Sequence, residues 1–127
     1  MDYKINNNQL LIYNLTNDTL KIIHEYDDII FDDKFNKSID ILYKFNNIKS
    51  IKLGHKINQP INNLPPNLQI LKLGDDFNQP INNLPPNLQK LKLCTKFNQP
   101  IDNLPSRLKY LHIGDQFNQT KIGRAHV

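Results

Sequence analysis

The sequence predicts a solenoid of short parallel β-strands joined by helix-poor, proline-rich return segments. Three observations predict this fold. Near-identical segments begin at residues 58, 78 and 98 (NQPINNLPPNL, NQPINNLPPNL and NQPIDNLPSRL), at a constant offset of twenty residues. Each segment runs into the apolar spacing L-x-x-L-x-L, and prolines recur in every unit. A fixed period of this length is typical of repeat proteins, in which every unit packs only on its neighbours.

The apolar spacing predicts one short strand in each unit. Side chains of a strand alternate between its two faces, so an apolar pair such as Leu71 and Leu73 indicates one buried face. The strands are expected to end at Gly54, Gly74 and Gly114. Stacking the units gives five apolar ladders: Ile51, Leu71, Leu91, Leu111; Leu53, Leu73, Leu93, Ile113; Ile57, Phe77, Phe97, Phe117; Ile61, Ile81, Ile101; and Leu64, Leu84, Leu104.

The return segments cannot form long helices because prolines such as Pro60, Pro65 and Pro66 recur in them. The residue before each proline is also restricted to extended geometry. Extended and polyproline-like backbone is therefore expected there. A buried Leu or Phe stabilises by roughly 1.5–3 kcal/mol, whereas ordering the backbone costs about 1–2 kcal/mol per residue. A single unit should therefore be unstable alone, and the array should fold cooperatively.

The segment FNQPINNLPPNLQKLKLC at residues 77–94 resembles FNIP repeats, a leucine-rich-repeat-like family of social amoebae and giant DNA viruses. The resemblance covers about residues 35–120 and implies a leucine-rich-repeat-like solenoid. One feature departs from ordinary leucine-rich repeats, which place a ladder-forming Asn three residues after the last strand Leu. That position here holds Lys56, Asp76, Lys96 and Gln116, and the regular asparagines (Asn58, Asn78, Asn98 and Asn118) come two residues later. Whether they form a ladder that caps the backbone is open at this point.

The domain organisation predicted is an N-terminal cap over 1–34, followed by the repeats. The repeats are expected at 35–56 (a degenerate unit with two extra residues), 57–76, 77–96 and 97–116, with a partial unit at 117–120. Leu10–Leu15 and Leu20–Ile23 are apolar enough for strands or one helical turn, and they would cover the first edge of the sheet. An F-box, which often precedes FNIP repeats, has no match in this segment.

The last residues, KIGRAHV at 121–127, do not continue the repeat. They are similar to a translated sequencing adapter, so a non-native tail is expected. The chain is then a fragment of a longer array. In that case the last strand, within Leu108–Ile113, has an exposed edge that could support self-association.

Composition narrows the class of protein. The net charge of +4 and the pI of about 9.2 are compatible with an anionic partner without requiring one. A single cysteine, Cys94, excludes an intramolecular disulfide and suits a reducing compartment. No apolar run approaches the roughly 18 residues of a membrane span, and the N-terminus has no signal-peptide core. A cytoplasmic protein is expected.

Catalytic and metal-binding patterns are missing from the sequence. The four histidines, at positions 24, 55, 112 and 126, have no metal-site spacing. A pair of Cys94 and His112 on adjacent strands has nothing to orient the base and no oxyanion donor. No phosphate-binding glycine loop occurs. The sequence therefore predicts a protein that is not an enzyme and uses no cofactor or metal.

The outward residues of the strands are the candidate site. In a leucine-rich repeat these residues form the concave surface on which partners dock. They fall in two columns, Ser50, Ile70, Lys90, Tyr110 and Lys52, Lys72, Lys92, His112. The predicted partner-binding residues are Lys52, Ile70, Lys72, Lys90, Lys92, Tyr110 and His112.

Three readings of this face remain. The preferred one is docking of a protein partner, with the family resemblance adding that the chain could be the recognition part of a larger adaptor such as a ubiquitin-ligase substrate receptor. The second is binding of nucleic acid or another polyanion through the lysines. It is disfavoured because single-stranded nucleic acid needs more aromatic residues than one. The third is a solvated face that only discourages sheet aggregation.

Overall fold

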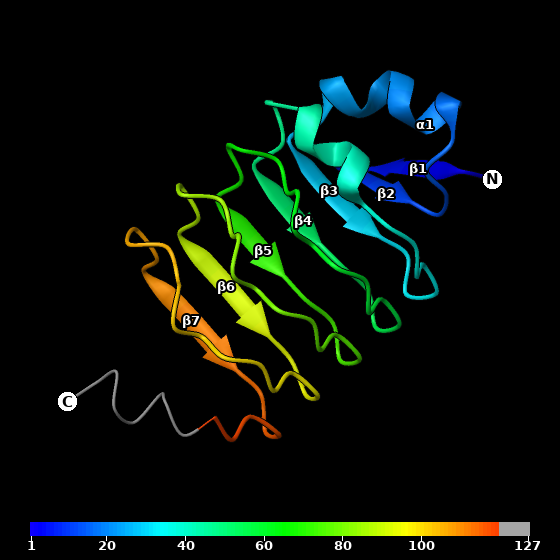
Figure 1. Cartoon of the computed structure of the whole chain (residues 1–127). Helices are drawn as coiled ribbons and strands as arrows, with labels where there is room; N and C mark the ends of the chain where they lie inside the picture. Colours follow the sequence, from blue (N-terminus) through cyan, green and yellow to red (C-terminus); the bar gives the residue numbers. More distant parts are fainter. Residues whose placement is uncertain (120–127) are drawn as a thin grey trace.

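The computed structural model describes residues 1–119 and shows one sheet of seven strands in the order of the sequence (Figure 1). The strands are β1 (Tyr3–Asn6), β2 (Gln9–Ile12), β3 (Asp28–Phe31), β4 (Ser50–Lys52), β5 (Ile70–Lys72), β6 (Lys90–Leu93) and β7 (Tyr110–Ile113). A short helix α1 (Asn17–Ile22) and two 3-10 helices, η1 (Ile23–Glu25) and η2 (Asp40–Lys44), complete the elements. The tail predicted at 121–127 and Thr120 lie outside the described residues.

The repeat register is the one that the sequence predicts. From β2 to β7 the strands are parallel, and Ile51, Leu71, Leu91 and Leu111 stand side by side as partners. Between the strands of β4 to β7, residues 54–69, 74–89 and 94–109 contain turns and bends without any helix. The helix-poor leucine-rich-repeat-like solenoid is therefore confirmed. The polyproline-like geometry of the return segments stays a prediction.

The core lies between the sheet and the return segments. Leu71 and Phe77 are 0% and 1% exposed, and Leu91 and Phe97 are 1% exposed each. The phenylalanine rings stack, with Phe77 and Phe97 at 6.3 Å between centroids and 5° between planes. Each ladder residue is thus covered by the equivalent residue of the next unit, which is the cooperative packing expected of a solenoid.

One core expectation is wrong. Leu111 was placed in the buried strand ladder, yet it is 39% exposed. Ile113 and Phe117 of the same unit are only partly buried. The reason is geometric, because no further strand lies beyond β7 within residues 1–119 to cover these side chains. Burial at this position therefore depends on the neighbouring unit and not on the residue type.

The regular asparagines form a ladder along the return side of the sheet. The backbone amide of Asn78 donates to Oδ1 of Asn58 at 2.9 Å, and Nε2 of Gln79 donates to the same oxygen at 3.1 Å. The same pair of bonds recurs in the neighbouring units, from Asn58 and Gln59 to Asn36, from Asn98 and Gln99 to Asn78, and from Asn118 and Gln119 to Asn98. The shifted asparagines therefore satisfy backbone amides of the following unit.

The N-terminal residues extend the sheet with a different local structure. β1 and β2 form an antiparallel hairpin, and its turn residues Asn7 and Asn8 have positive φ of 51° and 66°. Asparagine tolerates this left-handed backbone, which two-residue hairpin turns require. Thr16 caps α1 by accepting a hydrogen bond from the Thr19 amide at 3.4 Å. Both alternatives named for this segment thus occur, a strand at Gln9–Ile12 and a helix at Asn17–Ile22.

The two extra residues of the unit 35–56 lie in its return segment. Asn36 pairs with Asn58, 22 positions later, whereas the Lys49 carbonyl accepts from Gln69, 20 positions later. The insertion is therefore between Asn36 and Lys49, where the chain forms η2. The strand register of β4 is unaffected by it. The outward face consequently stays in register from β3 to β7.

Candidate functional site

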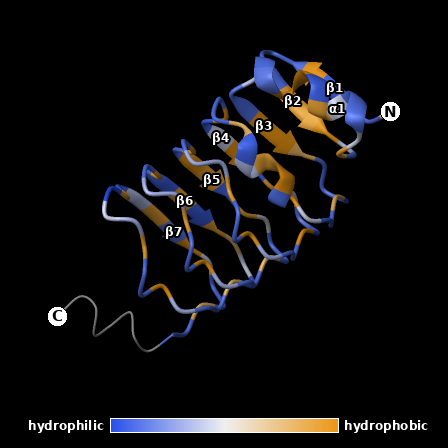
Figure 2. Ribbon diagram, turned by 45° about the horizontal axis from the view of Figure 1, so that its top comes forward, coloured by the Kyte–Doolittle hydropathy of each residue, from blue (hydrophilic) through white to orange (hydrophobic). Residues whose placement is uncertain are grey.

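The seven predicted site residues all come from β4 to β7 and lie in two adjacent columns. Lys52, Lys72, Lys92 and His112 pair across neighbouring strands, and Ile70, Lys90 and Tyr110 do the same. Together with Ser50 these residues are called the outward strand face below. Figure 2 shows hydrophilic and hydrophobic colour alternating along β6, as its sequence KLKL requires. The role of the outward strand face in binding stays a prediction.

The lysines are crowded together by the sheet geometry. Neighbouring strands are about 4.8 Å apart, so the column Lys52, Lys72, Lys92 repeats a positive charge at that spacing. Within residues 1–119 no carboxylate lies within 4 Å of the ammonium groups of these lysines. Lys90 in the next column likewise has no ion pair there. These four lysines therefore form no ion pair within residues 1–119.

The face changes character toward the N-terminus. Ile30 of β3 stands beside Lys52, and Asp28 stands beside Ser50. Nε2 of Gln9 donates to Oδ2 of Asp28 at 2.8 Å. The positive part of the sheet consequently begins at β4, and an apolar residue and a carboxylate border it on β3.

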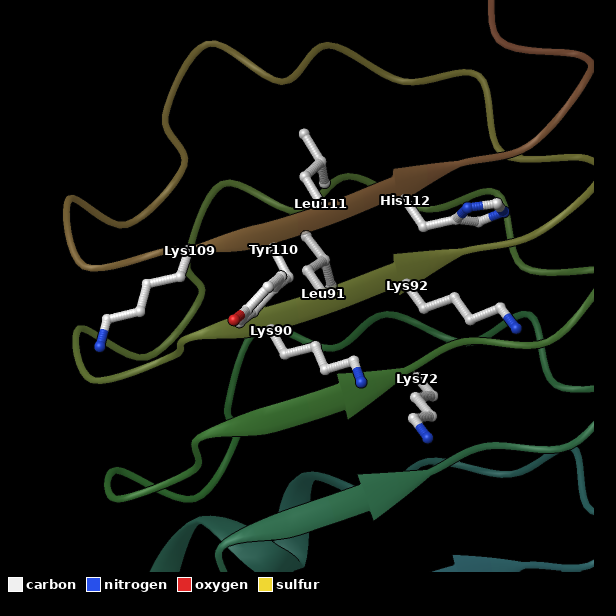
Figure 3. Close-up of a pocket in the computed structure, with 8 residues that line it drawn as sticks. All are labelled: Lys72, Lys90, Leu91, Lys92, Lys109, Tyr110, Leu111 and His112. Carbon is white, nitrogen blue, oxygen red and sulfur yellow. The ribbon is translucent and has the colours of Figure 1, made fainter.

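A hollow of about 550 Å³ lies on the outward strand face over β5, β6 and β7 (Figure 3). It is lined by Lys72, Lys90, Leu91, Lys92, Lys109, Tyr110, Leu111 and His112. We call it the lysine hollow. Four of its side chains are lysines and none is a carboxylate. Tyr110, which is 66% exposed, stands beside Lys90 on the neighbouring strand.

Lys109 belongs to the lysine hollow although the sequence analysis did not single it out. It lies one residue before β7, in the column of Lys49, Gln69 and Gln89, whose backbone groups bond across the units. Lys109 lies outside the strand, so the alternation of side chains within β7 does not predict where it points. Its position directly before Tyr110, which faces outward, is the signal that could have placed Lys109 near the outward strand face.

Acidic side chains border the face where the strands end. A smaller hollow of about 330 Å³ is lined there by Asp33, His55 and Asp75 together with Lys52, Lys72 and Lys92. His55 Nδ1 lies 3.2 Å from Asp75 Oδ2, and His55 Nε2 lies 3.9 Å from Asp33 Oδ2. The Thr95 hydroxyl donates to Asp75 at 3.2 Å. These charged residues therefore link successive units instead of being unrelated surface charges.

Cys94 and His112, the candidate catalytic pair, line two different hollows, and no hydrogen bond joins them within residues 1–119. Burial raises the pKa of the Cys94 thiol; Lys92 opposes this, Asp75 adds to it and Lys52 opposes it. A raised pKa keeps the thiol protonated at neutral pH, so Cys94 is poorly suited to nucleophilic chemistry.

Within residues 1–119 no three His, Cys, Asp or Glu side chains come together as a metal site. In the same range none of the helices has the length and apolar character that crossing a membrane requires.

Comparisons with known proteins agree with this architecture. The family model described as FNIP Repeat matches residues 61–96 and 97–122. Among solved structures, the chain is similar to CroV588, described as a novel circular LRR protein, with a TM-score of 0.69 and 34% sequence identity. That match covers 76% of this chain and 15% of the CroV588 chain, so this chain spans less than a fifth of that protein's length. Among curated proteins no sequence matches significantly.

Proposed function

Since this chain belongs to the FNIP repeat proteins, a leucine-rich-repeat-like family, we propose that it is a non-catalytic protein–protein interaction module. Leucine-rich-repeat-like families typically mediate protein–protein interaction. The partner docks on the outward strand face. The observation that carries this proposal is the set of lysines on β4, β5 and β6 that have no carboxylate partner within residues 1–119.

Unpaired lysines favour binding because a partner's acidic groups can reach them without breaking an internal ion pair. By contrast, Lys96 is held by Asp76 at 3.1 Å. Exposed aromatic residues supply much of the binding energy in protein interfaces. Tyr110 is such a residue, and half-buried Ile70 adds apolar surface in the same column. The face thus combines charge with apolar anchors, as interaction surfaces do.

Binding of nucleic acid or another polyanion is the rival function, and the lysine column is the feature that favours it. A nucleic-acid platform stacks successive bases on aromatic rings. The outward strand face offers one such ring, that of Tyr110. Binding to phosphate backbone also weakens steeply with salt. A protein partner anchored partly by apolar contacts should be less sensitive.

The test is affinity capture with the full chain and two charge-reversal variants. Lys72→Glu with Lys92→Glu alters the outward strand face, whereas Lys37→Glu with Lys44→Glu alters exposed lysines on the return side. We expect the first variant to lose specific protein partners and the control to keep them. Capture that is unchanged by the first variant would place the interaction elsewhere. Tight retention on heparin or DNA, lost with salt, would favour the polyanion instead.

We further propose that the chain is part of a larger adaptor, that it is located in the cytoplasm, and that it self-associates through the edge of β7. Size-exclusion chromatography over a range of concentrations tests the last of these proposals. A single monomer peak at every concentration would remove it.

A further inference from the structure

We propose that the lysine hollow binds a phosphorylated side chain of the protein partner. This inference rests on the proposed function, because it names the chemistry of the group that the outward strand face recognises. Its basis is the composition of the hollow, which is lined by four lysines, a histidine and a tyrosine and by no carboxylate. No other hollow described on this chain combines this many lysines with no acidic residue.

Three lysines of the hollow come from two adjacent strands. Lys72, Lys90 and Lys92 extend from β5 and β6 on the same side of the sheet (Figure 3). Lys72 and Lys92 are direct neighbours across these strands. Like charges on neighbouring strands, which lie about 4.8 Å apart, repel one another. A multiply charged anion between them removes this repulsion and accepts several hydrogen bonds at once.

A phosphate group fits this arrangement better than carboxylates do. A phosphate ester carries about −1.5 to −2 charges and three acceptor oxygens on one atom. Glu or Asp side chains on one face of an extended peptide recur every second residue, at about 6.6 Å, which does not match the spacing of the lysines. The arginine fork suits carboxylate and phosphate alike, and lysine binds phosphate as a point charge. Arg107, the one arginine within residues 1–119, instead bonds to Asn87 at 3.2 Å.

The borders of the positive surface limit the size of the anion. Asp28 lies in the outward column on β3, and Asp33 and Asp75 lie at the ends of the strands. A nucleic-acid strand that followed the lysines would run past these carboxylates and be repelled. A single phosphate on a protein segment stays inside the positive area. The same segment can lay apolar side chains on Tyr110 and Ile70.

The hydroxyl of Tyr110 and the ring of His112 are further polar groups that line the hollow. Tyr110 offers a neutral O–H donor and a flat apolar ring. The Tyr110 hydroxyl and the His112 ring favour ligands whose shape matches their positions, whereas the lysines select only for negative charge. The phosphorylated residue is therefore expected to be read together with an apolar neighbour, and free inorganic phosphate is expected to bind much more weakly.

The experiment uses the full chain and three immobilised peptide pools of random sequence. The pools carry a central phosphothreonine, glutamate or threonine, and a short DNA duplex serves as a fourth ligand. We expect retention at least about tenfold greater on the phosphothreonine pool than on the glutamate pool, the size of effect that one additional charge-assisted contact gives. Lys90→Gln with Lys92→Gln should abolish the difference. Lys37→Gln with Lys44→Gln is the matched control, and circular dichroism verifies that both variants fold.

Equal retention on the phosphothreonine and glutamate pools would overturn the inference, and so would stronger retention on DNA. A second arm separates this failure from failure of the proposed function. Partners are captured from extract before and after phosphatase treatment. Capture that survives phosphatase but is lost with Lys72→Glu and Lys92→Glu supports the interaction module and refutes the phosphate. Capture that depends on neither refutes both proposals.

Discussion

Two rungs of the same ladder, one inside the array and one at its last described unit, differ sharply in burial. Leu91 is 1% exposed, whereas Leu111, at the same position of the next unit, is 39% exposed. The residue type and the position within the strand are the same, whereas Leu91 of β6 has a strand on each side and Leu111 of β7 has a described strand on one side only. The comparison teaches that a unit's core is completed by the following unit.

The largest expected effect is the loss of an inner ladder side chain. Leu91→Ala should lower the free energy of unfolding by about 3–5 kcal/mol, because the side chain is fully buried and the cavity cannot collapse. Leu111→Ala should cost about 1 kcal/mol or less, since its side chain is already partly in water. Urea denaturation of both variants measures the difference. Equal losses would mean that the packing of β7 is as complete as that of β6.

The second comparison concerns the equivalent positions Gly54, Gly74, Cys94 and Gly114, which follow the strands β4 to β7. A Cβ added at Gly74 would clash with the backbone carbonyl oxygen of Gly54. Gly74→Ala should therefore destabilise by about 1–3 kcal/mol, the usual cost of overpacking. Cys94 stands at the equivalent position with a Cβ already in place, so Cys94→Ala should change stability much less. Thermal unfolding tests both, and an unaffected Gly74→Ala variant would show that the neighbouring backbone can shift.

The asparagine ladder provides the third. Asn78→Ala removes the acceptor of the Asn98 amide and of the Gln99 side chain. The expected loss is about 1–2 kcal/mol, because an unsatisfied amide costs more than a hydrogen bond contributes. Asn118→Ala should cost less, since Oδ1 of Asn118 accepts no hydrogen bond within residues 1–119. Chemical denaturation with amide hydrogen exchange at Asn98 distinguishes the two.

The smallest effect concerns the column Lys52, Lys72 and Lys92, where a substitution should raise the free energy of unfolding instead of lowering it. Lys72 has a lysine on each side, whereas Lys52 has one lysine neighbour and Ile30 on the other side. Lys72→Gln should stabilise the chain by about 0.3–0.8 kcal/mol at low salt, and Lys52→Gln by about half of that. Both gains should vanish in high salt, where exposed charges are screened. A stabilisation that persists in high salt would exclude charge repulsion as its cause.

The sequence predicted most of the repeat architecture because the repeat itself carries the information. Identical segments at a fixed offset determine the rungs, and the period-two apolar pattern determines which side chains of β5 and β6 face inward. The same alternation placed Lys72, Lys92 and Tyr110 on one outward face. Physically, these features follow from local backbone geometry and need no knowledge of distant contacts.

Other features depend on contacts that local patterns do not encode. The hydrogen-bond partners of Asn58 and Asn78 depend on how side chains of neighbouring units are oriented. The sequence pattern therefore does not predict the asparagine ladder. The exposure of Leu111 depends on whether another strand follows β7. The apolar pattern predicts a buried side chain there only if such a strand is present. The hairpin of β1 and β2 belongs to a region where the repeat has eroded. There the Asn7–Asn8 dipeptide was the available signal, since asparagine accepts the positive φ of a tight turn.

The bonds of the asparagine ladder have a consequence for how such a gene can change. Each backbone-amide bond of the ladder joins an asparagine to its equivalent one unit away, and the acceptors Asn58, Asn78 and Asn98 are the same residue type in each unit. Inserting or deleting a whole unit of twenty residues leaves each remaining unit with the same chemical neighbour. Recombination between copies can thus lengthen or shorten the binding surface by about 4.8 Å per step. The length of the binding surface can therefore change by unequal crossover. No destabilised intermediate, of the kind that single point mutations can produce, is needed.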